Sequence, residues 1–330
     1  MEFTTVVGKS RKRHNKYVNS SISSSGAGQS IELSPFLLIK KLDQADFEFR
    51  NECSAVFDLI KLSLKSCCKQ IESYLCSHAE SSLSSSTASS STTSTIQIEW
   101  SIVSYGVGRF SDSWIALYQL ALLRLIAEHL HVPPSRISLT DPQFSPSELT
   151  FLRDQLSFHA SNGNDDCRHA ISTEPPYNAC TLFFMPHCGK PMYHNLLLAN
   201  WSPSRLSRVA LFGNSLTNMR ERAPSSALFA RNFLYIERAI TANGFATEAE
   251  LSVAAVRRSG VQCTALDAIE PVLNDTALTY FDPKRVAIDS CDFWAIVEPE
   301  YDQSSLEEFI PMRSTTSPKQ TTSDYSSRFA

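Results

Sequence analysis

Short apolar runs alternate with stretches of helical apolar spacing between residues 96 and 300 of this chain. Helical spacing follows Ser111 or Asp112, the Ser145-Pro146-Ser147-Glu148 capping box, and Pro191. Runs bounded by glycine, proline or polar residues predict strands at 96–105, 137–139, 181–185 and 209–212. This alternation is typical of an α/β domain with a Rossmann-like, mostly parallel sheet flanked by helices.

The stretch 181–215 shows the pattern most clearly. Its first apolar run ends at Pro186, and Pro191 suits the first turn of a helix because a proline loses no hydrogen bond there. A second apolar run follows at 209–212, which is the separation a right-handed βαβ crossover requires. We therefore expect two neighbouring parallel strands here.

The remaining patterns are shorter. Helical spacing predicts a helix at 46–76 and another at 227–240, and Thr247-Glu248-Ala249-Glu250 is a capping pattern that opens a further short helix. Residues 157–178 are polar and irregular, which predicts a surface loop. Further strands are predicted at 268–273, 277–281 and, at the sheet edge, 293–297.

Composition divides the chain into five segments. We expect a serine-rich disordered tail at 1–30, an N-terminal helical segment at 31–76 that packs on the sheet, a Ser/Thr low-complexity linker at 77–95, the α/β domain at 96–300, and a disordered tail at 301–330.

Charge and cysteine content narrow the class of protein. The net charge is -4 and the pI is near 6.1, so direct nucleic-acid binding is not expected. Nine cysteines without a CxxC pair suit free thiols in a reducing compartment. No apolar run is long enough for a membrane helix, and no signal-peptide core is present. A soluble intracellular protein is expected.

A basic cluster, Lys9-Ser10-Arg11-Lys12-Arg13-His14-Asn15-Lys16, stands in the N-terminal tail. It has the composition of a nuclear-import signal or of a contact with an acidic partner, and equally that of a solvated charge run.

Several motifs occur in the order found in one family: VSYGVGRFSDSWIALYQLALL, LTDPQFS, TLFFMPHCGKPMYHNLLLANWS, VALFGNS and LNDTALTYF. Across residues 98–281 the chain resembles the SRR-like ("sensitivity to red light reduced") proteins. The resemblance implies a regulatory protein of cytoplasm and nucleus that acts with other proteins, in circadian and light signalling and in regulation of haem biosynthesis. Leu117, Leu216 and Thr279 depart from the family pattern, which often has arginine, phenylalanine and histidine there.

Candidate ligand-binding residues follow the predicted strands. Tyr105-Gly106-Val107-Gly108 could cradle a phosphate, with Ser111 where the third glycine of a dinucleotide fingerprint would stand. Asp141 ends the next strand, where a ribose-binding carboxylate would lie. The cofactor candidates here are a nucleotide or S-adenosylmethionine, and the alternative is a tight turn with an Asp-Pro turn.

The segment from His187 to Asn195 contains a second set of candidates. Cys188 lies near a predicted helix N-terminus and Lys190, which can depress a thiol pKa, although neighbouring His187 should point the opposite way. His187, Cys188 and His194 could instead ligate a metal or haem iron, but their spacing matches no standard zinc site. The simplest interpretation is a hydrogen-bonded loop. Asn195 completes this set.

Polar residues flank two further strands: Asn214 and Ser215 after one, and Asn274 and Asp275 before another. They could line a common cleft if the strands are parallel, or stabilise turns. An enzyme should show a deep pocket lined by Tyr105, Gly108, Asp141, His187 and Asn214, whereas an interaction module should show an exposed apolar patch. The catalytic residues of an enzyme are not identified by the sequence.

Overall fold

A computed structural model describes residues 34–83, 97–174, 176, 178–258, 260, 266–286 and 290–297. These belong to one unit, residues 33–330, and a second unit, residues 1–32, lies outside the described residues. The predictions for the basic cluster and both tails therefore fall outside them, as does most of the 77–95 linker.

Seven strands form one mixed sheet in the order β3-β2-β1-β4-β5-β7-β6. The first five are parallel, while β7 is antiparallel to both β5 and β6. The strands are β1 (Glu99–Tyr105), β2 (Ile137–Thr140), β3 (His159–Ser161), β4 (Ala179–Met185), β5 (Val209–Asn214), β6 (Ala246–Glu250) and β7 (Thr276–Phe281). The prediction of an α/β domain with a mostly parallel sheet flanked by helices is confirmed.

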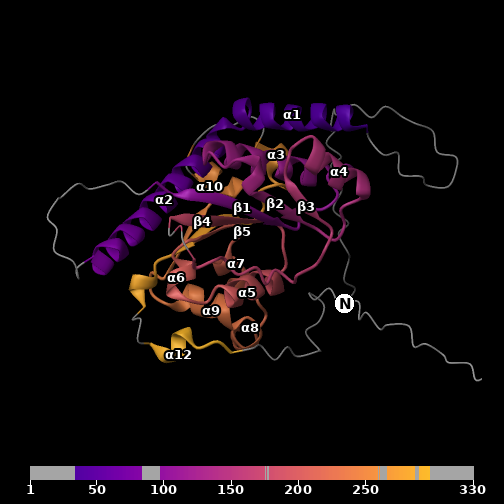
Figure 1. Cartoon of the computed structure of the whole chain (residues 1–330). Helices are drawn as coiled ribbons and strands as arrows, with labels where there is room; N and C mark the ends of the chain where they lie inside the picture. Colours follow the sequence, from indigo (N-terminus) through magenta and orange to yellow (C-terminus); the bar gives the residue numbers. More distant parts are fainter. Residues whose placement is uncertain are drawn as a thin grey trace, which may run out of the picture. The chain divides into compact units, whose positions relative to one another are not determined.

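Helices cover both faces of this sheet (Figure 1). One face carries α1 (Pro35–Asn51), α2 (Ser54–Leu83), α3 (Trp114–His129), α4 (Pro146–Asp154), α10 (Val253–Arg258) and α11 (Leu266–Ile269). The other carries α5 (Lys190–Ala199), α6 (Pro203–Leu206), α7 (Leu216–Glu221), α8 (Ser226–Asn232), α9 (Leu234–Thr241) and α12 (Cys291–Trp294). Short 3-10 turns span Pro134–Arg136 and Pro283–Arg285.

Strand side chains alternate between two buried apolar clusters. In β4, Leu182 and Phe184 pack with the α1–α3 face, while Phe183 and Met185 pack with the α5–α9 face. Phe184 also stacks on Phe212 of β5, with ring centroids 5.1 Å apart. Because both faces are covered, the central strands are apolar throughout, which is why they are visible in the sequence as continuous runs.

The N-terminal helical segment consists of two helices, not the single helix predicted at 46–76. Ser34 caps α1 through a bond from Leu37 N, and the chain turns at Cys53 before α2 begins. Cys53 and Phe49 are fully buried at this junction. The turn therefore carries apolar side chains, so it does not interrupt the hydrophobic pattern. The segment packs on the sheet domain as predicted, and α2 continues to Leu83, into the predicted linker.

Capping patterns had mixed outcomes. The box at Ser145 is present, with reciprocal bonds between Ser145 and Glu148. The pattern at Thr247 was wrong as a helix signal: residues 246–250 form edge strand β6, paired with β7. Sheet pairing satisfies this backbone, and the Glu248 carboxylate instead accepts bonds from the first turn of α7.

Four other predictions were wrong. The loop at 157–178 contains strand β3, which adds to the sheet edge beside β2. The helix at 227–240 is broken at Phe233 into α8 and α9. The strand at 268–273 is instead α11 and a turn, because Ile269, Val272 and Leu273 are buried at helical spacing. The edge strand at 293–297 is instead helix α12 and extended chain, because the rings of Phe293 and Trp294 pack on Trp201.

Within the described part of the chain, no helix is both long enough and apolar enough to cross a membrane.

Candidate functional site

The carboxyl ends of the parallel strands and the start of β7 meet at one edge of the sheet. Asn214, which ends β5, pairs with Thr276, which begins β7. Because β7 is antiparallel, the residues before it lie at the same edge as the residues after β5, and Ser215 N donates to Asp275 O at 2.8 Å. The condition that these strands be parallel was therefore wrong, since convergence here requires the antiparallel pairing.

The loop after β1 is held by the loop after β2. Gly106 and Gly108 both have positive φ, 71° and 77°, which glycine adopts without strain. Gly108 N donates to Asp141 Oδ2 at 2.7 Å, and Gln143 N donates to Asp141 Oδ1 at 2.8 Å. Asp141 is buried, so its carboxylate stabilises the glycine loop, and the Gly108 N–H that would face a phosphate is already bonded.

A second carboxylate reinforces this connection. Glu148 of α4 accepts from both the backbone N–H and the hydroxyl of Ser111, each at 2.9 Å. Its other oxygen accepts from Ser145 N at 2.8 Å, as the capping box requires. The sequence indicated the capping bond, but the bond to Ser111 depends on bringing the two loops together.

The loop after β4 places His187 and Cys188 on opposite sides, as predicted. His187 has a φ of 61° and is exposed, with its N–H donating to Asn214 Oδ1 at 2.9 Å and its Nε2 donating to Val272 O at 3.2 Å. Cys188 is buried and its thiol donates to Tyr105 O at 3.4 Å. Asn214 Nδ2 also donates to Cys188 O at 3.2 Å, so Asn214 holds the whole loop.

This environment does not activate the thiol. Burial raises the pKa of Cys188 well above its usual value, and the nearby Asp141 carboxylate raises it further. The prediction of a depressed thiol pKa was therefore wrong, because removal from water outweighs the helix N-terminus. Cys188 is a neutral, packed thiol.

Haem or metal ligation through this loop does not fit the geometry. His187 is exposed while Cys188 points into the core, so the two do not offer donor atoms to a common iron. His194 is fully buried in α5, with its ring 5.2 Å from Tyr235, and burial lowers its pKa to about 4. Across the described ranges, no three His, Cys, Asp or Glu side chains are grouped so that they could hold a metal ion.

Other candidates stabilise loops. Tyr105 donates its hydroxyl to Asp165 Oδ2 at 2.7 Å, and burial together with this bond raises the Tyr105 pKa. Asn195 Nδ2 donates to Asp166 O at 3.0 Å. Tyr105 and Asn195 therefore both hold the loop after β3. Lys190 is the first residue of α5 and is half-buried.

The residues around β7 form a polar network. Asp275, at a φ of 59°, accepts two bonds from Arg222, at 2.8 and 3.0 Å, and one from Asn218. Asn274 is exposed in the same turn. Ser215 caps α7 and donates to Glu248, which also accepts from Thr279, one of the positions that depart from the SRR-like pattern. The sequence did not point to Glu248, because its partners come from two distant segments, residues 215–217 and Thr279.

A cavity of about 340 Å³ lies beside the glycine loop, and we call it the glycine-loop pocket. Three predicted residues line it, Gly106, Gly108 and His187, whereas Tyr105, Asp141 and Asn214 do not. The other lining residues were not predicted: Val107, Arg109, Asp112, Ser113, Ile115, Ala116, Gln119 and Gln143. Gln119 could have been noticed as a lone amide on the otherwise apolar face of α3.

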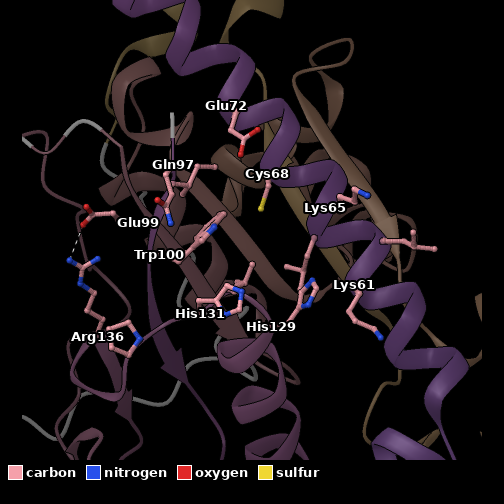
Figure 2. A pocket seen from close by; sticks show the side chains of 15 residues that line it. Lys61, Lys65, Cys68, Glu72, Gln97, Glu99, Trp100, His129, His131 and Arg136 are labelled. Carbon is pink, nitrogen blue, oxygen red and sulfur yellow. Dashed lines mark hydrogen bonds and ion pairs between the residues drawn. The ribbon is translucent and has the colours of Figure 1, made fainter. Parts of the chain in front are cut away.

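A larger cavity of about 780 Å³ lies at the opposite edge, where β1 begins (Figure 2). Side chains of α2, including Cys68, face the start of β1 near Trp100, with His129 and His131 from the end of α3 on the other side. Arg136 and Glu99 bond to each other here at 2.8 Å. No sequence pattern indicated this cavity, because its walls come from three distant segments.

Comparison with known proteins decides the family. The family model for the SRR1 domain matches residues 68–290. The chain belongs to the SRR1 domain family. The SRR1 domain thus includes the last turns of α2 and the whole sheet, and the membership suggests a regulatory protein of the SRR1-like type.

Individual relatives agree with this assignment. The chain is 31% identical over 207 residues to a mouse SRR1-like protein, covering 61% of this chain and 80% of the mouse protein. It is 33% identical over 131 residues to the Arabidopsis thaliana protein Sensitivity to Red Light Reduced 1, covering 40% of this chain and 45% of that protein. A Drosophila melanogaster SRR1-like protein is 33% identical over 114 residues, 34% of this chain and 38% of that protein. No solved structure matches the chain.

Proposed function

We propose that this SRR1 domain is a regulatory module whose state is set by a small ligand in the glycine-loop pocket. One observation carries the proposal: a buried polar side chain that lines this pocket has no partner among the described residues. Gln119 is 3% exposed, and no hydrogen bond joins its amide to another described residue. Buried polar groups are normally bonded, so a bound molecule is the natural partner.

The position in the fold supports the same proposal. From β1, the chain crosses through α3 over one face to β2, whereas α5 connects β4 to β5 over the other face. The strand order therefore changes direction between β1 and β4, and open α/β sheets bind ligands at such a point. The glycine-loop pocket lies directly beyond the end of β1.

The name of the Arabidopsis relative refers to sensitivity to red light. By analogy we propose that this chain takes part in light or circadian signalling and in regulation of haem biosynthesis, through protein partners in cytoplasm and nucleus. The basic cluster at 9–16 would serve nuclear import in this proposal.

An S-adenosylmethionine- or nucleotide-dependent enzyme is the second candidate, and the strand order favours it. Against it stands one contact: Gly108 N and the Asp141 carboxylate, the predicted phosphate-binding and ribose-binding groups, bond to each other. We therefore rank regulation above catalysis.

The test measures thermal unfolding of the full chain with S-adenosylmethionine, NAD, ATP and haem. A ligand at a hundred times its Kd stabilises the native state by about 2.7 kcal/mol, roughly 5–10 °C for a domain of this size. Ile115→Phe fills the pocket from the half-exposed first turn of α3 and should abolish the shift. Leu62→Phe, in the larger cavity, is the matched control and should retain it. No shift with any ligand would overturn the proposal and favour protein partners alone.

A further inference from the structure

One end of the glycine-loop pocket has a positive electrostatic character. The helix α3 begins there, with Ser113, Ile115 and Ala116 in the wall, and no acidic residue lies in its first turn. The N-terminus of a sixteen-residue helix carries a partial positive charge. Ser113 Oγ accepts from Ala116 N at 3.3 Å, and the first two residues of the helix have no helical partner for their N–H groups. The Arg109 guanidinium adds a full charge at the same wall.

One carboxylate competes for this charge. Asp112 bonds Arg109 Nη2 at 2.9 Å, and it is exposed, with 47% of its side chain accessible. This bond uses only one nitrogen of the guanidinium, and 40% of the Arg109 side chain is accessible. The wall therefore keeps guanidinium surface that Asp112 does not cover.

The other end of the pocket is neutral and buried. Gln119 follows Ile115 by four residues on α3, so the two residues lie on the same face of the helix, with Cα atoms about 6 Å apart along the axis. An amide both donates and accepts hydrogen bonds, and at 3% exposure it selects a polar, uncharged group.

Resting on the regulatory pocket proposed above, we propose that its ligand is a small organic anion with two recognition groups. A carboxylate or phosphate lies against the first turn of α3 and the Arg109 guanidinium. A neutral hydrogen-bonding group bonds the Gln119 amide. A volume of about 340 Å³ is near the lower end for ligand pockets, so the ligand is smaller than a dinucleotide.

Titration calorimetry with four probes tests this class. Adenosine monophosphate and succinamate carry a phosphate and a carboxylate, respectively, together with a neutral polar group. Adenosine and succinamide are their uncharged counterparts. We expect at least one anion to bind at least tenfold more tightly than its neutral counterpart, and the stronger of the two anions identifies the charged group. Raising the salt concentration from about 20 to about 300 mM should weaken the anion only.

Three variants complete the design. Asp112→Asn removes the competing exposed carboxylate and should tighten anion binding about threefold, without changing binding of the neutral probe. Gln119→Leu should weaken anion binding about tenfold, the usual effect of one lost hydrogen bond. Lys65→Gln, at the larger cavity, should change the affinity of neither the anionic nor the neutral probe.

The outcomes separate the two proposals. If a neutral probe binds as tightly as its anion and Ile115→Phe abolishes both, the pocket is real and the anionic class is wrong. If the anion binds but neither Asp112→Asn nor Gln119→Leu alters its affinity, the assigned contacts are wrong. If none of the four probes binds, the anionic class is overturned. Binding of a ligand from the thermal panel would then still support the proposed regulatory pocket, and binding of none would overturn that proposal as well.

Discussion

The carboxylate of Asp141, at the end of β2, accepts the backbone N–H of Gly108, in the loop after β1, at 2.7 Å. Two residues that the sequence marks as separate phosphate and ribose contacts are thus partners of each other. The bond ties Gly108, which lines the glycine-loop pocket at a positive φ of 77°, to the loop after β2.

Asp141→Ala should lower the free energy of unfolding by about 2 kcal/mol, because it removes a charged acceptor from two backbone N–H groups. Asp141→Asn keeps one carbonyl acceptor and should lose about half as much. Urea unfolding of the full chain measures both. An Asp141→Ala variant as stable as the wild type would mean that the carboxylate does not stabilise the fold.

Gly213→Ala should destabilise the sheet by about 3 kcal/mol or more. A Cβ at this position would lie 2.2 Å from the Tyr193 hydroxyl and 2.8 Å from Met185 O, and neither can move, since the hydroxyl bonds Met185 O and Asn214 N. Chemical denaturation measures the loss. Gly163→Ala is the matched control, because its Cβ would meet only the Ser161 hydroxyl, at 3.2 Å. Equal stability of the two variants would contradict the packing described here.

Cys188 should resist alkylation in the native protein. Its burial and raised pKa leave little thiolate at pH 8, whereas Cys76 is only half-buried. With iodoacetamide and peptide mass spectrometry, we expect Cys76 to react at least about tenfold faster, and the difference to disappear in urea. Preferential labelling of Cys188 would contradict its burial and support the depressed thiol pKa that the sequence predicts.

His194 should make stability fall as the pH decreases. Burial lowers its folded-state pKa to about 4 from an ordinary value of 6.5, so between these pH values the unfolded state binds more protons. The contribution of His194 to the free energy of unfolding is complete above pH 6.5. It is lost progressively towards pH 4, by up to ~3 kcal/mol.

A variant separates the contribution of His194 from that of Asp46. Burial raises the pKa of Asp46 to about 6, so the Asp46 contribution makes stability rise as the pH decreases. His194→Gln should be less stable than wild type at pH 7, and the difference should shrink as the pH falls to 4. Urea unfolding at several pH values provides the comparison. A difference that does not change with pH would show that His194 does not titrate as described.

The sequence by itself determined the parallel core and the alternation of strands and helices along the chain. The runs at 181–185 and 209–212 are continuous because helices bury both faces of β4 and β5, and proline and the Ser145 box mark helix starts through local bonds. It also determined that His187 and Cys188 diverge, since adjacent side chains leave a strand in opposite directions. These features depend on neighbours within one or two turns of chain.

Only the tertiary structure decided which polar residues share a wall. The capping pattern at Thr247 became strand β6 because pairing with β7, some thirty residues away, outweighed a local bond. The direction of β7 brought Asp275 beside Ser215, and burial reversed the expected effect of a helix terminus on Cys188. Gln119 became a candidate only when α3 placed it against the glycine loop. Strand direction, desolvation and cavity shape arise from contacts distant in sequence, so local pattern carries no record of them.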